Sequence, residues 1–153
     1  MEDKAGMTFI VKNVSKVVIA FILLFGQNIV LYGHLTPGGG FAGGVILAVG
    51  FVLAVFAFGK DKVLAVVSDF WASMLDNIGA FLFFLIALVG LPFGYFFYNW
   101  LWHGEPFKLV SAGTIPLSNI SIALKVGACL YAIFLGLSIY GSMVTESKKE
   151  EQE

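Results

Sequence analysis

The chain has 153 residues, 59% hydrophobic and 12% charged, with a formal net charge of −1 and a mean hydropathy of +0.91. Too few residues are charged to cover the surface of a soluble globule. The net charge close to zero provides no basic field for nucleic acid. A single cysteine, Cys129, excludes an intrachain disulfide and a cysteine-rich metal site. We expect one membrane domain over residues 1–145 and a polar C-terminal tail over 146–153.

Four apolar stretches predict transmembrane helices, because about 20 predominantly apolar residues suffice to cross the hydrocarbon core. The stretches are continuously apolar, which favours helices over barrel strands, whose polarity alternates. The predicted fold class is therefore an all-α integral membrane protein with about four transmembrane helices. Residues 63–75 could lie in the interface or lengthen the third helix. The expected helices cover about 14–34, 40–59, 76–102 and 119–144.

The distribution of lysines predicts the orientation. With four spans, Lys108 alone lies in the connections of one side, and the other side carries seven lysines. The excess of positive charge on cytoplasmic segments then predicts that both termini are cytoplasmic. Trp100 and Trp102 fall at the outer end of the third helix, where aromatic belts form. The seven lysines are Lys4, Lys12, Lys16, Lys60, Lys62, Lys148 and Lys149.

A glycine-rich segment joins the first two expected helices. Proline followed by three glycines cannot continue a helix and allows close backbone approach. The free N–H groups that open the second helix could bind an anion, but we favour a tight turn that lets two helices meet closely. A nucleotide loop is excluded, because the Gly-Lys-Ser/Thr ending is missing. The residues assigned to the turn and to helix packing are Pro37, Gly38, Gly39, Gly40, Gly43, Gly44 and Gly50.

Small residues also follow single helix faces, which lets membrane helices approach each other. In the third helix, Gly90 and Gly94 flank Pro92, so a kink or a packing notch is expected there. The small-residue face of the second helix consists of Gly43, Gly50, Ala54 and Ala57. The corresponding stripe of the fourth helix consists of Ser121, Lys125, Ala128, Cys129, Ala132 and Gly136.

Lys125, His34 and Asp76 are the candidates for an ion path. A lysine within a span costs about 2.5–3.5 kcal/mol on insertion scales, so Lys125 needs an ion partner, a water-filled path or snorkelling to the outer surface. His34 could relay protons, because its unperturbed pKa is near neutrality, or it could cap the turn at the interface. Asp76 is expected to open the third helix, where an acid complements the helix dipole.

The chain has no cluster of metal ligands and no nucleophile–base arrangement, so no catalytic site of its own and no cofactor are expected. It is also too small for the inverted repeats of a self-sufficient secondary transporter. These features predict a subunit of a larger assembly.

Two motifs resemble one family. His34 followed by Thr36-Pro37-Gly38-Gly39-Gly40-Phe41, together with the later 111–116 segment Ser-Ala-Gly-Thr-Ile-Pro, is similar to the B subunit (MnhB/MrpB) of Mrp-type multisubunit Na+/H+ antiporters. The resemblance covers nearly the whole chain and includes the equivalent subunits of archaeal membrane-bound hydrogenase and sulfur-reductase complexes.

The resemblance implies a small subunit of a Na+/H+ antiporter module in the cell membrane, within an archaeal energy-converting hydrogenase or a related respiratory complex. Its partners would be other membrane subunits and the lipid bilayer, with Na+ and H+ as transported ions. It would then belong to a redox-driven ion pump without holding the catalytic centre. A free-standing antiporter and a purely structural helix-packing role remain as alternatives.

Overall fold

The computed structural model describes residues 7–101, 104–109 and 111–150, which form helices and turns without strands. Four helices are long and apolar enough to cross a membrane: α1 (Phe9–Tyr32), α2 (Gly40–Phe58), α4 (Asp69–Val89) and α5 (Ile115–Glu150). A short helix α3 (Lys60–Leu64) and a 3-10 turn η1 (Leu91–Phe93) complete the described elements. The predicted all-α class and the four spans are confirmed.

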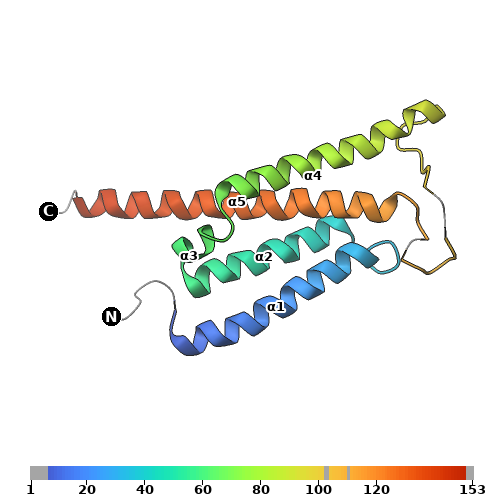
Figure 1. Ribbon diagram of the computed structural model, residues 1–153. Coiled ribbons are helices and arrows are strands. Elements are labelled where there is room, and N and C mark those ends of the chain that lie inside the picture. The colour runs from blue at the N-terminus through green and yellow to red at the C-terminus, as the bar shows by residue number, and fades with distance from the viewer. Residues whose placement is uncertain (1–6, 102–103, 110, 151–153) are drawn as a thin grey trace.

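The long helices form an open row rather than a closed bundle (Figure 1). α1 packs on α2, α2 on α5, and α5 on α4, while α1 makes only a minor contact with α5. The chain exposes 10333 Å², whereas a soluble monomer of this mass would expose about 7,600 Å². Much of the molecule is thus left for lipid or other chains to cover.

Glycines of α2 explain the close packing on both sides of this helix. A Cβ on Gly43 would overlap Val30 of α1, and one on Gly50 would lie 3.0 Å from Leu23 of α1. A Cβ on Gly44 would lie 2.9 Å from the carbonyl oxygen of Ala123 in α5. The sequence indicated only the face that contains Gly43 and Gly50, but α2 has a second glycine face toward α5.

The hydrophobic core lies where α3 and the segment after it fold back on the row. Val55, Val63, Ala72, Tyr131 and Leu135 form its buried centre. The Tyr131 hydroxyl donates a hydrogen bond to the carbonyl oxygen of Val67 at 3.3 Å. This bond joins the connection between α3 and α4 to α5, so the phenol oxygen is satisfied inside an apolar cluster.

The expected helix ends differ from the observed ones at several points. α1 begins at Phe9 rather than at 14, and α4 begins at Asp69, so residues 69–75 lengthen the third helix. Helix α4 ends at Val89 instead of 102. Gly90 and Pro92 lead into η1, and Gly94 takes φ 85°, so the helix stops rather than kinks.

The fourth helix is longer than predicted at both ends. α5 begins at Ile115, with Pro116 in its first turn where proline is tolerated. It continues to Glu150, through most of the predicted tail, and 36 residues extend about 54 Å. The remaining tail residues 151–153, like Lys4 and Trp102, lie outside the described residues, and the side chains of Lys148 and Lys149 are not described.

Candidate ion-pair site in the membrane span

An ion pair joins α4 and α5 within their membrane spans. The Lys125 ammonium donates a hydrogen bond to Asp76 Oδ1, with Nζ and Oδ1 2.6 Å apart. At 1.5 Å per residue, Asp76 lies about 10 Å inside α4 and Lys125 about 15 Å inside α5. The expectation that Asp76 opens the third helix is wrong, because that helix begins seven residues earlier at Asp69.

Gly79, one turn beyond Asp76, brings the two helices close enough for this pair. A Cβ on Gly79 would lie 2.6 Å from the Lys125 backbone nitrogen and 2.8 Å from the Ser121 carbonyl oxygen. Only a glycine permits that approach of backbone to backbone. Ser121 is 1% exposed, and its hydroxyl donates to the Leu117 carbonyl oxygen at 3.0 Å within the same helix.

The pair is only partly covered by the chain itself. The side chains of Lys125 and Asp76 keep 47% and 30% of their exposure. Hydrocarbon offers such groups no hydrogen bonds, so charged residues in spans normally face protein or water. The arrangement can therefore hold a balanced charge at membrane depth and exchange protons or cations where a polar environment reaches it.

His34 lies in the turn between α1 and α2, at the end of the molecule where the chain passes from α4 to α5. Its Nε2 is 3.3 Å from the Lys108 carbonyl oxygen, and its buried Nδ1 has no hydrogen-bond partner among the described residues. The Lys108 ammonium in turn pairs with Glu105 at 2.5 Å. His34 thus contacts the segment between α4 and α5, and the structure does not bring it together with Lys125 or Asp76.

The glycine-rich turn presses the start of α2 against α5. Gly38 and Gly39 adopt φ 152° and 119°, conformations that side chains rarely allow. The Gly40 N–H donates a hydrogen bond to Asn119 Oδ1 at 3.3 Å. Asn119 of α5 therefore takes one of the free N–H groups that begin α2, where an anion could otherwise bind.

Asn119 and Asn99 are positioning residues that the sequence did not single out. Asn99 Oδ1 accepts hydrogen bonds from the Thr114 N–H at 2.8 Å and its hydroxyl at 3.0 Å. The Asn99 amide donates to the Ala112 carbonyl oxygen at 3.2 Å. For Asn99 the available signal was an amide side chain between two aromatic residues, Tyr98 and Trp100, since a polar group in such surroundings usually needs a specific partner.

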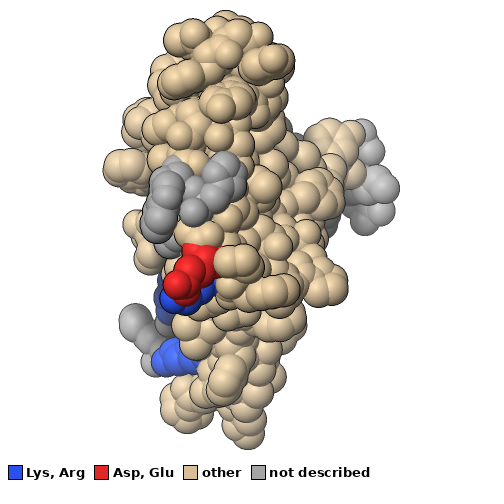
Figure 2. Space-filling model, turned by 90° about the vertical axis from the view of Figure 1, so that its right-hand side faces the viewer, with Lys and Arg blue, Asp and Glu red and all other residues tan. Residues whose placement is uncertain are grey.

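The end of the molecule that carries these turns is poor in charge. Figure 2 views the molecule from this end, and most of the surface seen is formed by uncharged residues. The described charged residues of its two connections are Glu105 and Lys108. Trp100 lies there too, 41% exposed, next to a run of exposed aromatic side chains. This pattern is typical of an aromatic belt.

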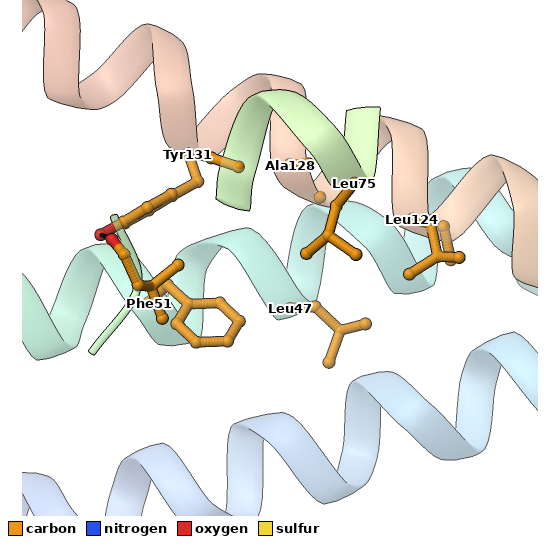
Figure 3. A pocket seen from close by; sticks show the side chains of 10 residues that line it. Leu47, Phe51, Leu75, Leu124, Ala128 and Tyr131 are labelled. Atoms are coloured by element: carbon orange, nitrogen blue, oxygen red, sulfur yellow. Dashed lines mark hydrogen bonds between the residues drawn. The ribbon is translucent and has the colours of Figure 1, made fainter. Parts of the chain in front are cut away.

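An apolar pocket of about 170 Å³ lies over α5 between α2 and α4 (Figure 3). Apolar atoms form its lining, and Figure 3 shows Leu47, Leu75 and Leu124 converging on it from three helices. The described residues contain no group of three His, Cys, Asp or Glu that could hold a metal ion. The full lining is Leu47, Phe51, Val67, Ala72, Leu75, Ala123, Leu124, Gly127, Ala128 and Tyr131.

Fold and site together define a polytopic membrane protein with an ion pair inside its spans. Residues 10–132 match the family model described as "Domain related to MnhB subunit of Na+/H+ antiporter". The chain belongs to this MnhB family, and the matched region contains His34, Asp76 and Lys125.

Its relatives come from archaea and bacteria. An uncharacterised protein of Methanocaldococcus jannaschii is 32% identical over 95% of this chain. A Staphylococcus aureus protein with the provisional name antiporter subunit mnhB2 is 32% identical over 84% of this chain and 93% of its own length. A chain of the membrane-bound sulfane sulfur reductase, an archaeal respiratory membrane complex, superposes with a TM-score of 0.70 and 29% identity over 88% of this chain.

The chain spans 58% of the length of the M. jannaschii protein and 59% of that reductase chain.

Proposed function

We propose that this protein is a small subunit of an Mrp-type Na+/H+ antiporter module in the cell membrane, within an archaeal respiratory complex such as a hydrogenase or sulfur reductase. Membership of the MnhB family supports the module. The similarity to a chain of the archaeal sulfane sulfur reductase complex supports the setting. The subunit contributes to assembly and to the ion path.

The observation that carries the role in the ion path is the Lys125–Asp76 pair within the spans. Ionisable residues at such depth mark ion pathways and proton relays, because a span without function avoids their cost. Protonation of Asp76 would release Lys125, and a cation near Asp76 would compete with Lys125 for the carboxylate. Either event changes the charge at this point of the path. His34 would act separately, exchanging protons at the outer end.

The experiment is Na+/H+ exchange by the purified complex in liposomes, comparing the wild type with Lys125→Ala. We expect a lower yield of complex, because Asp76 loses its cation, and loss of exchange by the complex that does assemble, with its composition checked by subunit stoichiometry. Wild-type exchange from a fully assembled Lys125→Ala complex would contradict the role of Lys125.

The proposed orientation places both termini in the cytoplasm. It is supported by the charge-poor end that carries Glu105 and Lys108 and by the lysines near the opposite end, such as Lys12, Lys16, Lys60 and Lys62. A fluorescent protein fused to the C-terminus should fluoresce in cells. Alkaline phosphatase should be inactive when fused at the C-terminus and active when inserted after Lys108. The opposite pattern would reverse the orientation.

A purely structural role is the second candidate, and the large exposed surface of the chain, 10333 Å², favours it because neighbouring subunits could cover it. In that case Lys125→Ala and His34→Ala would leave exchange intact. A free-standing antiporter is distinguished by mass spectrometry of the co-purifying subunits. A hydrogenase or sulfur-reductase subunit among them supports the respiratory complex, and its absence favours the free-standing antiporter.

A further inference from the structure

One lateral face of the row carries polar side chains at membrane depth. On α4 these are Ser73, Asp76 and Asn77, and on α5 the residue is Lys125, all within candidate membrane spans. Ser73, Asn77 and Lys125 are exposed, and Asp76 is half-buried. The Asn77 amide donates a hydrogen bond to the Ser73 carbonyl oxygen at 2.8 Å. We call these four residues the polar face.

The polar face does not open into the apolar pocket. At about 100° per residue, Asn77 lies about 200° around α4 from the pocket residue Leu75. Lys125 lies about 100° around α5 from the pocket residue Leu124. None of the four polar residues lines that pocket. The chain therefore offers lipid or neighbours two unlike sides, one apolar and one polar.

The polar face has hydrogen-bonding capacity that the described part of the chain leaves unused. An ammonium group has three donors, and among the described residues Asp76 is the hydrogen-bond partner of Lys125. Hydrocarbon cannot take the remaining donors, and each unsatisfied group there costs several kcal/mol. A surface of this kind is stable in a membrane when another polar group covers it.

Gly136 gives an independent indication on the same side of α5. It lies eleven residues after Lys125, which at about 100° per residue places it within about 20° of that lysine around the helix. A Cβ on Gly136 would meet no described atom within 4 Å, so packing within the described part of the chain does not require a glycine there. Glycine in an exposed helix interior costs about 1 kcal/mol relative to alanine. Close approach of a second backbone would offset that cost.

We infer that the polar face is a docking surface for a transmembrane helix of another subunit, which presents a side-chain hydrogen-bond acceptor to Lys125. This inference rests on the proposed function, which makes the chain one subunit among several. The neighbouring helix crosses α5 along the line from Lys125 to Gly136, and its acceptor occupies donors that Asp76 does not use. The apolar pocket on the other side needs no such partner and suits acyl chains or apolar side chains.

Site-specific photocrosslinking tests this docking surface. Phe84 lies on α4 seven residues after Asn77, which places it on the same side, and it is 55% exposed. Leu82 lies at nearly the same depth, about 200° away, and is 38% exposed. Each is replaced in turn by p-benzoylphenylalanine in the intact complex in its native membrane, and the irradiated products are identified by mass spectrometry.

We expect Phe84 to give an adduct with a different subunit, mapping about two helical turns from an Asp, Glu, Asn, Gln, Ser or Thr, because Phe84 lies about 12 Å along α4 from Asp76. Leu82 should give lipid adducts or a different protein product. Lipid adducts alone from Phe84, or a crosslink to a second copy of this chain, would overturn the inference.

The two proposals fail in different ways. If no other subunit co-purifies with the wild-type chain, the proposed function fails before any crosslink is made. If subunits co-purify and Phe84 still reaches only lipid, the docking surface alone is wrong.

Discussion

The two sides of the helical row differ in the groups that they present to the membrane. On one side, small and apolar residues of α2, α4 and α5 leave a pocket lined by apolar atoms. On the other, Lys125 and Asp76 form an ion pair that stays partly exposed. Lipid can satisfy the first side without help from protein, but not the second. The apolar side can therefore face lipid, whereas the polar side needs protein or water beside it.

Breaking the Lys125–Asp76 ion pair should have the largest effect on assembly. Lys125→Met leaves Asp76 without its cation, and Asp76→Leu leaves Lys125 without its anion. An unpaired charge in a span costs about 2.5–3.5 kcal/mol, so each single variant should assemble poorly.

The double variant Lys125→Met/Asp76→Leu is the matched control, because an apolar pair leaves no isolated charge. It should assemble better than either single variant, as measured by the yield of complex after affinity purification. Losses that simply add in the double variant would show that the two side chains do not act as a pair.

Substitution of Gly79 tests whether the close contact of α4 with α5 is needed to bring Asp76 and Lys125 together. Gly79→Leu should destabilise the protein by about 1–3 kcal/mol, towards the upper value because its Cβ would meet backbone atoms that cannot move aside. Gly136→Leu is the matched control within this chain, since a Cβ there meets no atom of the described residues within 4 Å. Thermal unfolding of the purified chain in detergent measures both. Equal melting temperatures for the two variants would mean that Gly79 is not needed for this contact.

Asn119 tests the contact between α2 and α5 at the end of the molecule that carries the glycine-rich turn. Asn119→Ala removes the hydrogen bond to the Gly40 N–H, which should cost about 1 kcal/mol. Ser118→Ala is a suitable reference, because among the described residues the Ser118 hydroxyl donates to the carbonyl oxygen of Thr114, directly before its own helix. Unfolding in detergent should show a lower melting temperature for Asn119→Ala than for Ser118→Ala. The reverse order would remove Asn119 from the account of how α2 begins.

The apolar pocket should show the smallest effect. Ala128→Leu adds buried methyl groups to a cavity of about 170 Å³, so the stability should rise slightly or stay unchanged. Na+/H+ exchange should stay within about twofold of the wild type, which corresponds to well under 1 kcal/mol. A strong loss of exchange with intact assembly would indicate that the ion path lies on the apolar side of the row and not beside Lys125 and Asp76.

The spans could be predicted from sequence because a membrane helix satisfies its backbone within one segment. The pairing of Lys125 with Asp76 could not, since it depends on which helices are neighbours and how each is rotated. It also depends on the start of α4 at Asp69, which places Asp76 at membrane depth and not at the helix end. A kink or a packing notch was expected at Gly90 and Pro92 within a helix that continued to 102, whereas α4 ends at Val89.

The glycines show the same limit. The turn at 37–40 was evident from composition, whereas the contact of Gly40 with Asn119 joins residues 79 positions apart. The cytoplasmic location of the termini and the roles of His34, Asp76 and Lys125 in an ion path stay predictions. They depend on partners and ions rather than on the chain alone.

The most direct measurement is Na+/H+ exchange by the assembled complex that carries Lys125→Met/Asp76→Leu, reconstituted in liposomes and followed with a pH-sensitive dye. If the ion pair belongs to the ion path, the complex assembles, because no lone charge remains, but exchange falls to the level of empty liposomes. Exchange at the wild-type rate from that complex would contradict the account and leave the chain a purely structural subunit.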